Sequence, residues 1–194
     1  MKSRSVNKIM CLILAGVMAA GALTAAPRSV SVGAAVCQSE DRNFPAEASS
    51  LLKEVQFTAT LLTRDAAILE SYSRATLTRE SHADRITTVK HHINTMGEKL
   101  NRLQAIRHQA TPWQQQAIDS IVSPAVMLAA HTQAAIELLN DRRNNLRHPD
   151  YTDHLRGIYD RSAQVKDTVS LHLEMAETQD KLERLKERTN ALGS

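Results

Sequence analysis

Three polar side chains have the types and the spacing that could hold a metal ion. His92 lies 19 residues before Thr111, and His131 lies 20 residues after it. A helical hairpin that turns at Thr111 would bring the two imidazoles to nearly the same level, beside its apolar seam. Asp65, on the preceding helix, would reach a similar height. Because imidazole and carboxylate are ordinary ligands of Zn²⁺ and Cu²⁺, His92, His131 and Asp65 form a candidate metal site.

Coincidence and packing explain the same pattern without an ion. The chain has eight histidines, and histidines scattered over polar helix faces will produce a matched pair by chance. Two imidazoles side by side at a helix interface need no metal. A packed pair is therefore the default interpretation, and the metal site is the alternative that a metal titration must support.

Motifs that carry catalysis or bind a cofactor are missing from the sequence. No Glu is followed by His at the third position, as di-iron bundles require, and no Cys-x-x-Cys-His motif for covalent haem is present. There is no Gly-x-Ser-x-Gly motif, and three of the six glycines precede residue 36, which leaves no phosphate-binding loop. We therefore expect no cofactor and no enzyme activity.

Apolar residues recur at alternating steps of three and four after Pro45, as in the helices of a bundle. This spacing predicts helices at residues 46–75, 81–109, 112–145 and 150–190. The predicted seam residues of the first two helices are Leu52, Val55, Ala59, Leu62, Ala66 and Leu69, then Ile86, Val89, Ile93, Met96, Leu100 and Leu103. Those of the last two are Ile118, Ile121, Ala125, Leu128, Thr132, Ala135 and Leu139, then Leu155, Ile158, Val165, Val169, Ala176, Leu182 and Leu185.

Capping residues and prolines predict where these helices begin and bend. Thr111 can cap the third helix, Pro112 suits the first helical position, and Gln114 stands where a capping box needs it. Ser81 is the expected cap of the second helix. Pro124 removes a backbone donor inside the third helix, so we expect a kink around residues 121–124 unless the helix starts again with Ser123 as its cap.

Four long helices with short connections, and only 3% aromatic residues, indicate an all-α fold. The economical arrangement is an antiparallel up-down-up-down four-helix bundle, with a dimer of longer helical hairpins as its main rival. The charged last turns of the fourth helix, at residues 181–188, are expected to extend beyond the bundle. The bundle domain would comprise residues 46–194.

Residues 1–35 have the pattern of a secretory signal peptide, because three basic residues precede an uncharged run at residues 9–26 and small residues follow. Cleavage after Ala35 is favoured over cleavage near Ala25 or Ala26. Retention of the run as a membrane anchor is the alternative, since about 18 apolar residues is the lower limit for a bilayer span. Residues 36–45, which contain Cys37, form a predicted flexible leader.

Removal of residues 1–35 would change the charge of the chain. The whole sequence has 24 basic and 21 acidic residues. The segment contains Lys2, Arg4, Lys8 and Arg28 but no acid, so 20 basic residues remain and the net charge becomes about −1. A nucleic-acid partner is therefore not expected.

Compartment, fold and missing motifs together predict a non-enzymatic binding or scaffolding module of the cell envelope. We expect it to be periplasmic or secreted, without a stable membrane span after signal cleavage, and to bind a protein partner or a second copy of itself. One alternative is an extracytoplasmic sensor or ligand-binding bundle. Another is a metal-binding bundle, which rests on His92 and His131.

Overall fold

The computed structural model describes residues 43–141 and 145–192. They form the helices α2 (Phe44–Tyr72), α3 (Arg79–Ile106), α4 (Pro112–Asn140) and α5 (Pro149–Leu192), with a short 3₁₀ turn, η1 (Arg107–Gln109), before α4. The predicted signal peptide, Cys37 and most of the predicted leader lie outside the described residues.

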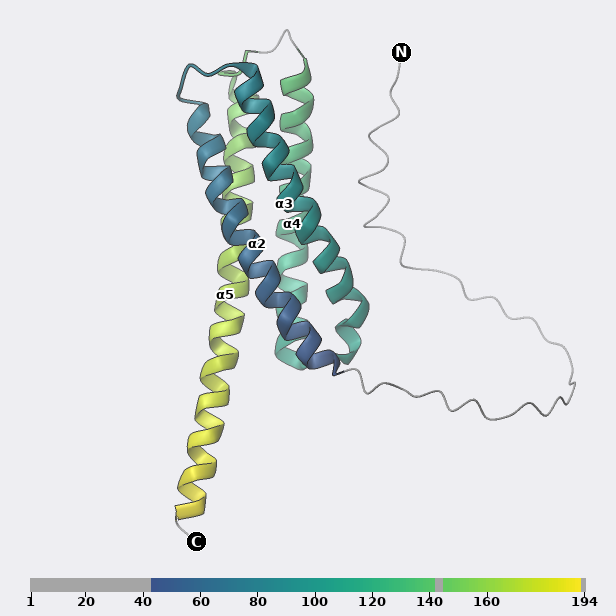
Figure 1. Ribbon diagram of the computed structural model, residues 1–194, viewed down its shortest axis with the longest axis vertical. Helices are drawn as coiled ribbons and strands as arrows, with labels where there is room; N and C mark the ends of the chain where they lie inside the picture. Colours follow the sequence, from purple (N-terminus) through teal and green to yellow (C-terminus); the bar gives the residue numbers. More distant parts are fainter. Residues whose placement is uncertain (1–42, 142–144, 193–194) are drawn as a thin grey trace, which may run out of the picture. The chain divides into compact units, whose positions relative to one another are not determined.

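The four helices pack side by side in an up-down-up-down bundle, which confirms the predicted fold class (Figure 1). Each helix contacts its neighbours in the chain, α5 closes the ring against α2, and α2 and α4 approach each other only slightly across the diagonal. Every described helix therefore has two flanking partners against which it can bury one apolar face.

The core follows most of the predicted seams. All six seam residues of α2 are buried, and so are five of the six on α3, with Ile93 half-buried. In α4, Pro124 is buried and the adjacent Ala125 is half-buried. The seam prediction is wrong for the end of α5, where Leu182 and Leu185 are exposed because no other described helix extends that far.

Helix starts depend on polar side chains, as their sequences indicate. Asn43 caps α2 by accepting a hydrogen bond from the backbone N–H of Ala46 at 3.1 Å. The predicted cap of the next helix is wrong by three residues, since Thr78 is the cap and its hydroxyl accepts from the N–H of Ser81 at 3.2 Å. The third helix also ends earlier than predicted, at Asn140, because Asp141 is extended.

The turn before α4 lies where the sequence predicts it, but its capping box is only half made. Gln114 Oε1 accepts from the backbone N–H of Thr111 at 2.9 Å, while the buried hydroxyl of Thr111 has no partner. The amide nitrogen of Gln114 donates instead to Pro45 O and Ser49 Oγ, each at 2.8 Å. Gln114 therefore joins the α4 turn to the start of α2.

Helix α4 continues through Pro124 without a second start. Of the described helices, it is the one that is long and apolar enough to span a membrane by length and composition, with a mean hydropathy of 1.3 over its most apolar window. Core helices of bundles meet the same criterion, and Ile118, Ile121 and Leu128 of α4 are completely buried against the other helices.

Candidate functional site

Asp65 and His92, two of the three predicted metal ligands, meet at the interface of α2 and α3. The buried carboxylate of Asp65 lies 3.1 Å from His92 Nε2 through one oxygen and 3.3 Å from Arg85 Nη1 through the other. Arg85 and His92 are seven residues apart and so share one face of α3. The Arg64 guanidinium also approaches the carboxylate, at 3.6 Å. These contacts make Asp65 the acceptor of a charged network.

His131, the third predicted ligand, pairs with a different residue at a different interface. Its Nδ1 lies 3.1 Å from Nδ1 of His154, which joins α4 to α5. Because two neutral acceptors would repel, one of these nitrogens carries a proton and the other accepts it. Burial lowers the pKa of His131, the charges of His154 and Arg161 lower it further, and Asp160 opposes the shift.

Gly157, one turn after His154, makes room for this histidine pair. A Cβ atom at position 157 would lie 2.6 Å from Cε1 and Nδ1 of His131 and 2.8 Å from its Cγ. A glycine inside a helix costs about 1 kcal/mol relative to alanine. At this position the cost is offset by space for an imidazole ring that any larger residue would displace.

The predicted ligands therefore do not form one group. Among the described residues, no cluster of three or more His, Cys, Asp or Glu side chains is arranged to hold a metal ion. The heights were predicted from the turn at Thr111 and from the loop near residue 78, and neither gives a position for His154, which follows the next loop. His131 lies nine residues before the end of α4 and His154 lies five residues after the start of α5, so equal spacing about the loop does not predict this pair.

A second buried polar pair, which the sequence argument also missed, lies near the α2–α3 loop. His82 and Tyr151 are both almost fully buried, and Nδ1 of the histidine lies 2.9 Å from the phenol oxygen. Tyr72 packs edge-on against the same imidazole, with ring centroids 5.4 Å apart. Burial lowers the pKa of His82, and nearby Arg79 adds to this effect, while burial raises the pKa of Tyr151. The pair stabilises the contact of α3 with the first turn of α5.

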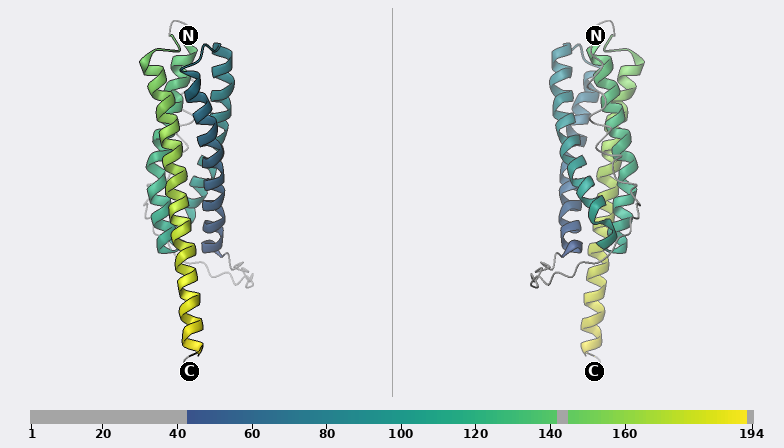
Figure 2. Two further views of the ribbon diagram at one scale, coloured as in Figure 1. Left: turned by 90° about the vertical axis from the view of Figure 1, so that its left-hand side faces the viewer. Right: turned by 90° about the vertical axis from the view of Figure 1, so that its right-hand side faces the viewer.

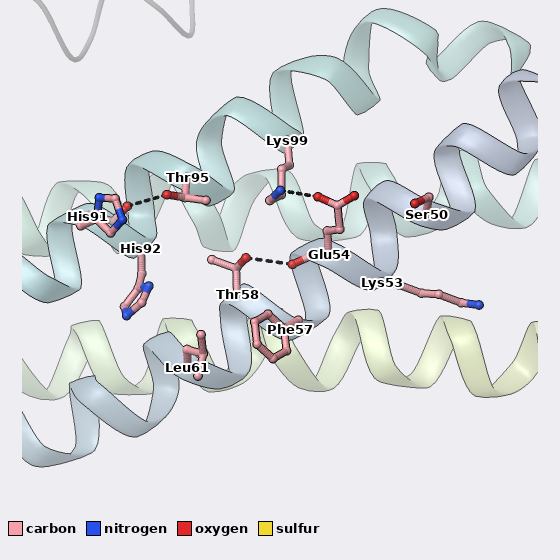
Figure 3. Close-up of a pocket in the computed structure, with 10 residues that line it drawn as sticks. All are labelled: Ser50, Lys53, Glu54, Phe57, Thr58, Leu61, His91, His92, Thr95 and Lys99. Carbon is pink, nitrogen blue, oxygen red and sulfur yellow. Dashed lines mark hydrogen bonds and ion pairs between the residues drawn. The ribbon is translucent and has the colours of Figure 1, made fainter. Parts of the chain in front are cut away.

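An open groove of about 480 Å³ runs between α2 and α3 (Figure 3). Phe57, which is 66% exposed, and Leu61 provide its apolar surface. Lys99 crosses from α3 to Glu54 on α2, and His92 lies at the opposite end of the groove from Ser50. The groove thus combines one exposed aromatic ring with several polar groups.

Helix α5 extends well past the other three helices (Figure 2). It has 44 residues, whereas the other long helices have 28 or 29. Residues 174–192 are exposed except for the half-buried Ala176, and we call them the projecting end. A helix of this length that lacks tertiary contacts is only marginally stable in water.

The projecting end continues an apolar pattern that starts on the outer side of the bundle. Leu171 is 55% exposed and Leu173 is 8% exposed, and two residues correspond to about 200° of helix rotation, so they face nearly opposite directions. Residues on the face of Leu171 follow strict alternating steps of four and three. This α5 stripe consists of Leu171, Met175, Thr178, Leu182, Leu185, Thr189 and Leu192.

Comparisons of the chain with protein-family models, with curated proteins and with solved structures found no match. The geometry of these sites is therefore the basis for assigning a function to the protein. Two of them, the Asp65 network and the histidine pair at His131, lie between helices of the bundle, where their hydrogen bonds specify how those helices pack. The groove and the α5 stripe are open to a partner.

Proposed function

We propose that this protein is a non-enzymatic binding or scaffolding module of the cell envelope, periplasmic or secreted, that acts through helix–helix contact at the projecting end of α5. The observation that carries the proposal is the α5 stripe. Its large apolar members are exposed, with Met175 at 59% and Leu185 at 56%, although their spacing is that of a coiled-coil seam.

The composition around the stripe favours a helical partner over a membrane surface. The stripe contains one apolar or Thr residue at every seam position, and charged residues of both signs surround it. Helices that lie on membranes usually have a broad apolar face opposite a polar face rich in Lys and Arg. A narrow seam with mixed charges instead suits knobs-into-holes packing against another helix.

The envelope location is supported by residues 1–35, whose pattern is that of a secretory signal peptide. Amino-terminal sequencing of the protein recovered from its native compartment tests this part of the proposal. A mature chain that begins near Val36 would support export and cleavage, whereas an intact Met1 on a cytoplasmic protein would contradict them.

Trypsin accessibility tests whether the projecting end is docked. The exposed residues Lys181, Arg184, Lys186 and Arg188 are cleavage sites within it. We expect rapid cleavage there in dilute purified protein and slow cleavage in intact envelope preparations. Equal and rapid cleavage in both preparations would overturn the proposed docking.

Two matched pairs of substitutions test whether the α5 stripe is responsible for the protection from trypsin. Replacing Leu182 and Leu185 with Gln removes two apolar seam residues without adding a charge or a tryptic site, and Gln forms helices about as well as Leu. Glu183→Gln with Glu187→Gln is the control, because both residues are exposed and lie outside the stripe. We expect the first pair to lose protection in the envelope and the control pair to keep it.

A ligand-binding or sensing function is the second candidate, and the α2–α3 groove favours it. Phe57 offers a ring for stacking, while Lys53 of α2 and Lys99 of α3, the latter paired with Glu54, provide positive charge on the two sides of the groove. This combination suits a small aromatic or aliphatic molecule with an acidic group. Binding of such compounds should perturb NMR signals of the groove in the wild type but not in Phe57→Ala, and a library that perturbs neither protein would contradict this candidate.

A further inference from the structure

We infer that the α5 stripe binds the same stripe of a second copy of this chain, in antiparallel orientation. This inference rests on the proposed function, because it names the partner for the docking of the projecting end. The register that it requires places Met175 opposite Leu185 of the second copy and Thr178 opposite Leu182 of the second copy. By the two-fold symmetry of such a dimer, every contact away from the symmetry axis occurs twice.

The threonines in the stripe are compatible with burial in this seam. Thr178 Oγ1 donates to Glu174 O at 2.8 Å, and Thr189 Oγ1 donates to Leu185 O at 2.9 Å, so both hydroxyls are satisfied within their own helix. The bundle core uses the same arrangement for the buried Thr58 and Thr132. A neighbouring helix therefore meets mainly the methyl groups.

Charges beside the stripe select the antiparallel orientation. One flank contains Glu174, Lys181 and Arg188, and the other contains His172, Gln179 and Lys186. In a parallel in-register pair, residues of the first flank face residues five positions later on the second flank. Lys181 would then face Lys186 of the second copy, twice, and Glu174 would face only the uncharged Gln179.

In an antiparallel pair, the first flank of one helix instead faces the first flank of the second copy. Glu174 then lies close to Arg188 of the second copy and within reach of its Lys181, which gives two kinds of attractive contact, each present twice. One like-charge pair remains, between the two copies of Lys181 at the symmetry axis. Electrostatic attraction thus favours the antiparallel pair, whereas repulsion opposes the parallel one.

The position of the stripe leaves space for this pairing. The overlap extends from Leu171 to Thr189 of each chain, about 28 Å of helix at 1.5 Å per residue. The last part of α5 lies past the end of the bundle in Figure 2, and the first two stripe residues, Leu171 and Met175, are exposed. Because Leu171 faces away from the buried Leu173, the second copy would approach α5 on the side opposite the other helices of the bundle.

Disulfide formation between two single-cysteine variants tests both partner and orientation. The full-length chain with Cys11→Ser and Cys37→Ser receives either Met175→Cys or Leu185→Cys, and the variants are oxidised alone and as an equal mixture. We expect covalent dimers almost only in the mixture, because residue 175 faces residue 185 of the other copy. Cross-linking of each variant alone would indicate parallel pairing and overturn the inferred orientation, and no cross-linking in any sample would overturn the inference entirely.

Analytical ultracentrifugation provides the quantitative test and separates the two proposals. We expect reversible dimers of the unmodified chain at micromolar concentrations, about 100-fold weaker dimerisation for Leu182→Gln with Leu185→Gln, and little change for Glu183→Gln with Glu187→Gln. A chain that is monomeric at every concentration but still protected from trypsin in the envelope would overturn self-association and leave docking intact. A monomer without protection would overturn both.

Discussion

The two halves of α5 carry apolar residues at the same spacing but in different surroundings. From Tyr151 to Val169 the apolar residues Leu155, Ile158 and Val165 are completely buried against α2 and α4. From Met175 onward, the large apolar residues are more than half exposed. Heptad spacing therefore marks a face suited to helix packing, and the presence of a neighbour decides whether that face belongs to the core.

The stripes of the two halves also lie on different sides of the helix. The buried apolar residues of the first half, which we call the core stripe, end at Leu173. The positions that would continue the core stripe are occupied mainly by polar residues such as Asp180. The α5 stripe begins at Leu171, before the core stripe ends. The apolar face thus moves to the outer side of α5 at the level where the bundle ends, as expected for a helix that leaves one packing partner and meets another.

The largest predicted difference between the halves is in folding stability. Leu155→Ala removes a fully buried side chain and should lower the free energy of unfolding by about 2–5 kcal/mol. Leu182→Ala, the same substitution in the projecting end, should change it by less than about 0.5 kcal/mol in dilute solution. Urea denaturation of the two variants measures both values. Similar losses at the two positions would show that the projecting end packs against its own bundle.

A second prediction concerns the two glycines in described helices. Gly157→Ala should lower the free energy of unfolding by about 1–3 kcal/mol, because the new Cβ would displace the ring of His131. Gly97→Ala should raise it by about 0.5–1 kcal/mol, since no heavy atom lies within 4 Å of the new Cβ and alanine favours helix.

A double-mutant cycle separates the contact with His131 from a general effect on the helix. In the background His131→Ala, Gly157→Ala should lose most of its destabilising effect. An equal loss in both backgrounds would mean that the imidazole is not the group that excludes a larger residue.

A third, smaller effect is a dependence of the free energy of unfolding on pH, which should come from residues of the bundle alone. The pKa values of His82 and His131 are lowered in the folded protein from their usual 6.5. The unfolded chain therefore binds more protons than the folded chain just below that pH, so the free energy of unfolding should fall as pH drops through about 6.5. Urea titrations at a series of pH values measure this slope.

The variant His82→Gln tests whether protonation of His82 causes part of this dependence of stability on pH. Glutamine can still hydrogen-bond to Tyr151 but does not titrate. We expect a shallower dependence on pH than in the unmodified chain. Identical slopes would show that protonation of His82 does not contribute.

The smallest free energies should appear in local opening of the projecting end. Backbone amides of residues 178–190 should exchange with solvent through openings that cost about 0–1 kcal/mol in dilute protein, whereas amides of residues 155–169 should exchange only with global unfolding. Hydrogen exchange at two protein concentrations measures this contrast. Protection of residues 178–190 should rise with concentration, and protection independent of concentration would argue against pairing with a second copy.

Most of the bundle could be predicted because each helix repeats its apolar spacing over many turns. The seams of α2 and α3 were found almost completely, and the turn at Thr111 was located correctly. Caps and ends were less accurate, because Thr78 and Ser81 are both good caps and only the backbone conformation distinguishes them. The pairing of Asp65 with His92 came from the height argument, whereas His131 required knowledge of which helix it faces.

By itself, the sequence determined that residues 46–190 form long amphipathic helices, how many of them the described part contains, and which side of most of them is apolar. These properties depend on local periodicity and on residues that begin or end helices. Only the tertiary structure decided which imidazole meets which partner and where the core ends along α5. Those outcomes depend on how helices distant in sequence lie side by side, and the end of the α5 stripe is exposed because the other described helices stop before reaching it.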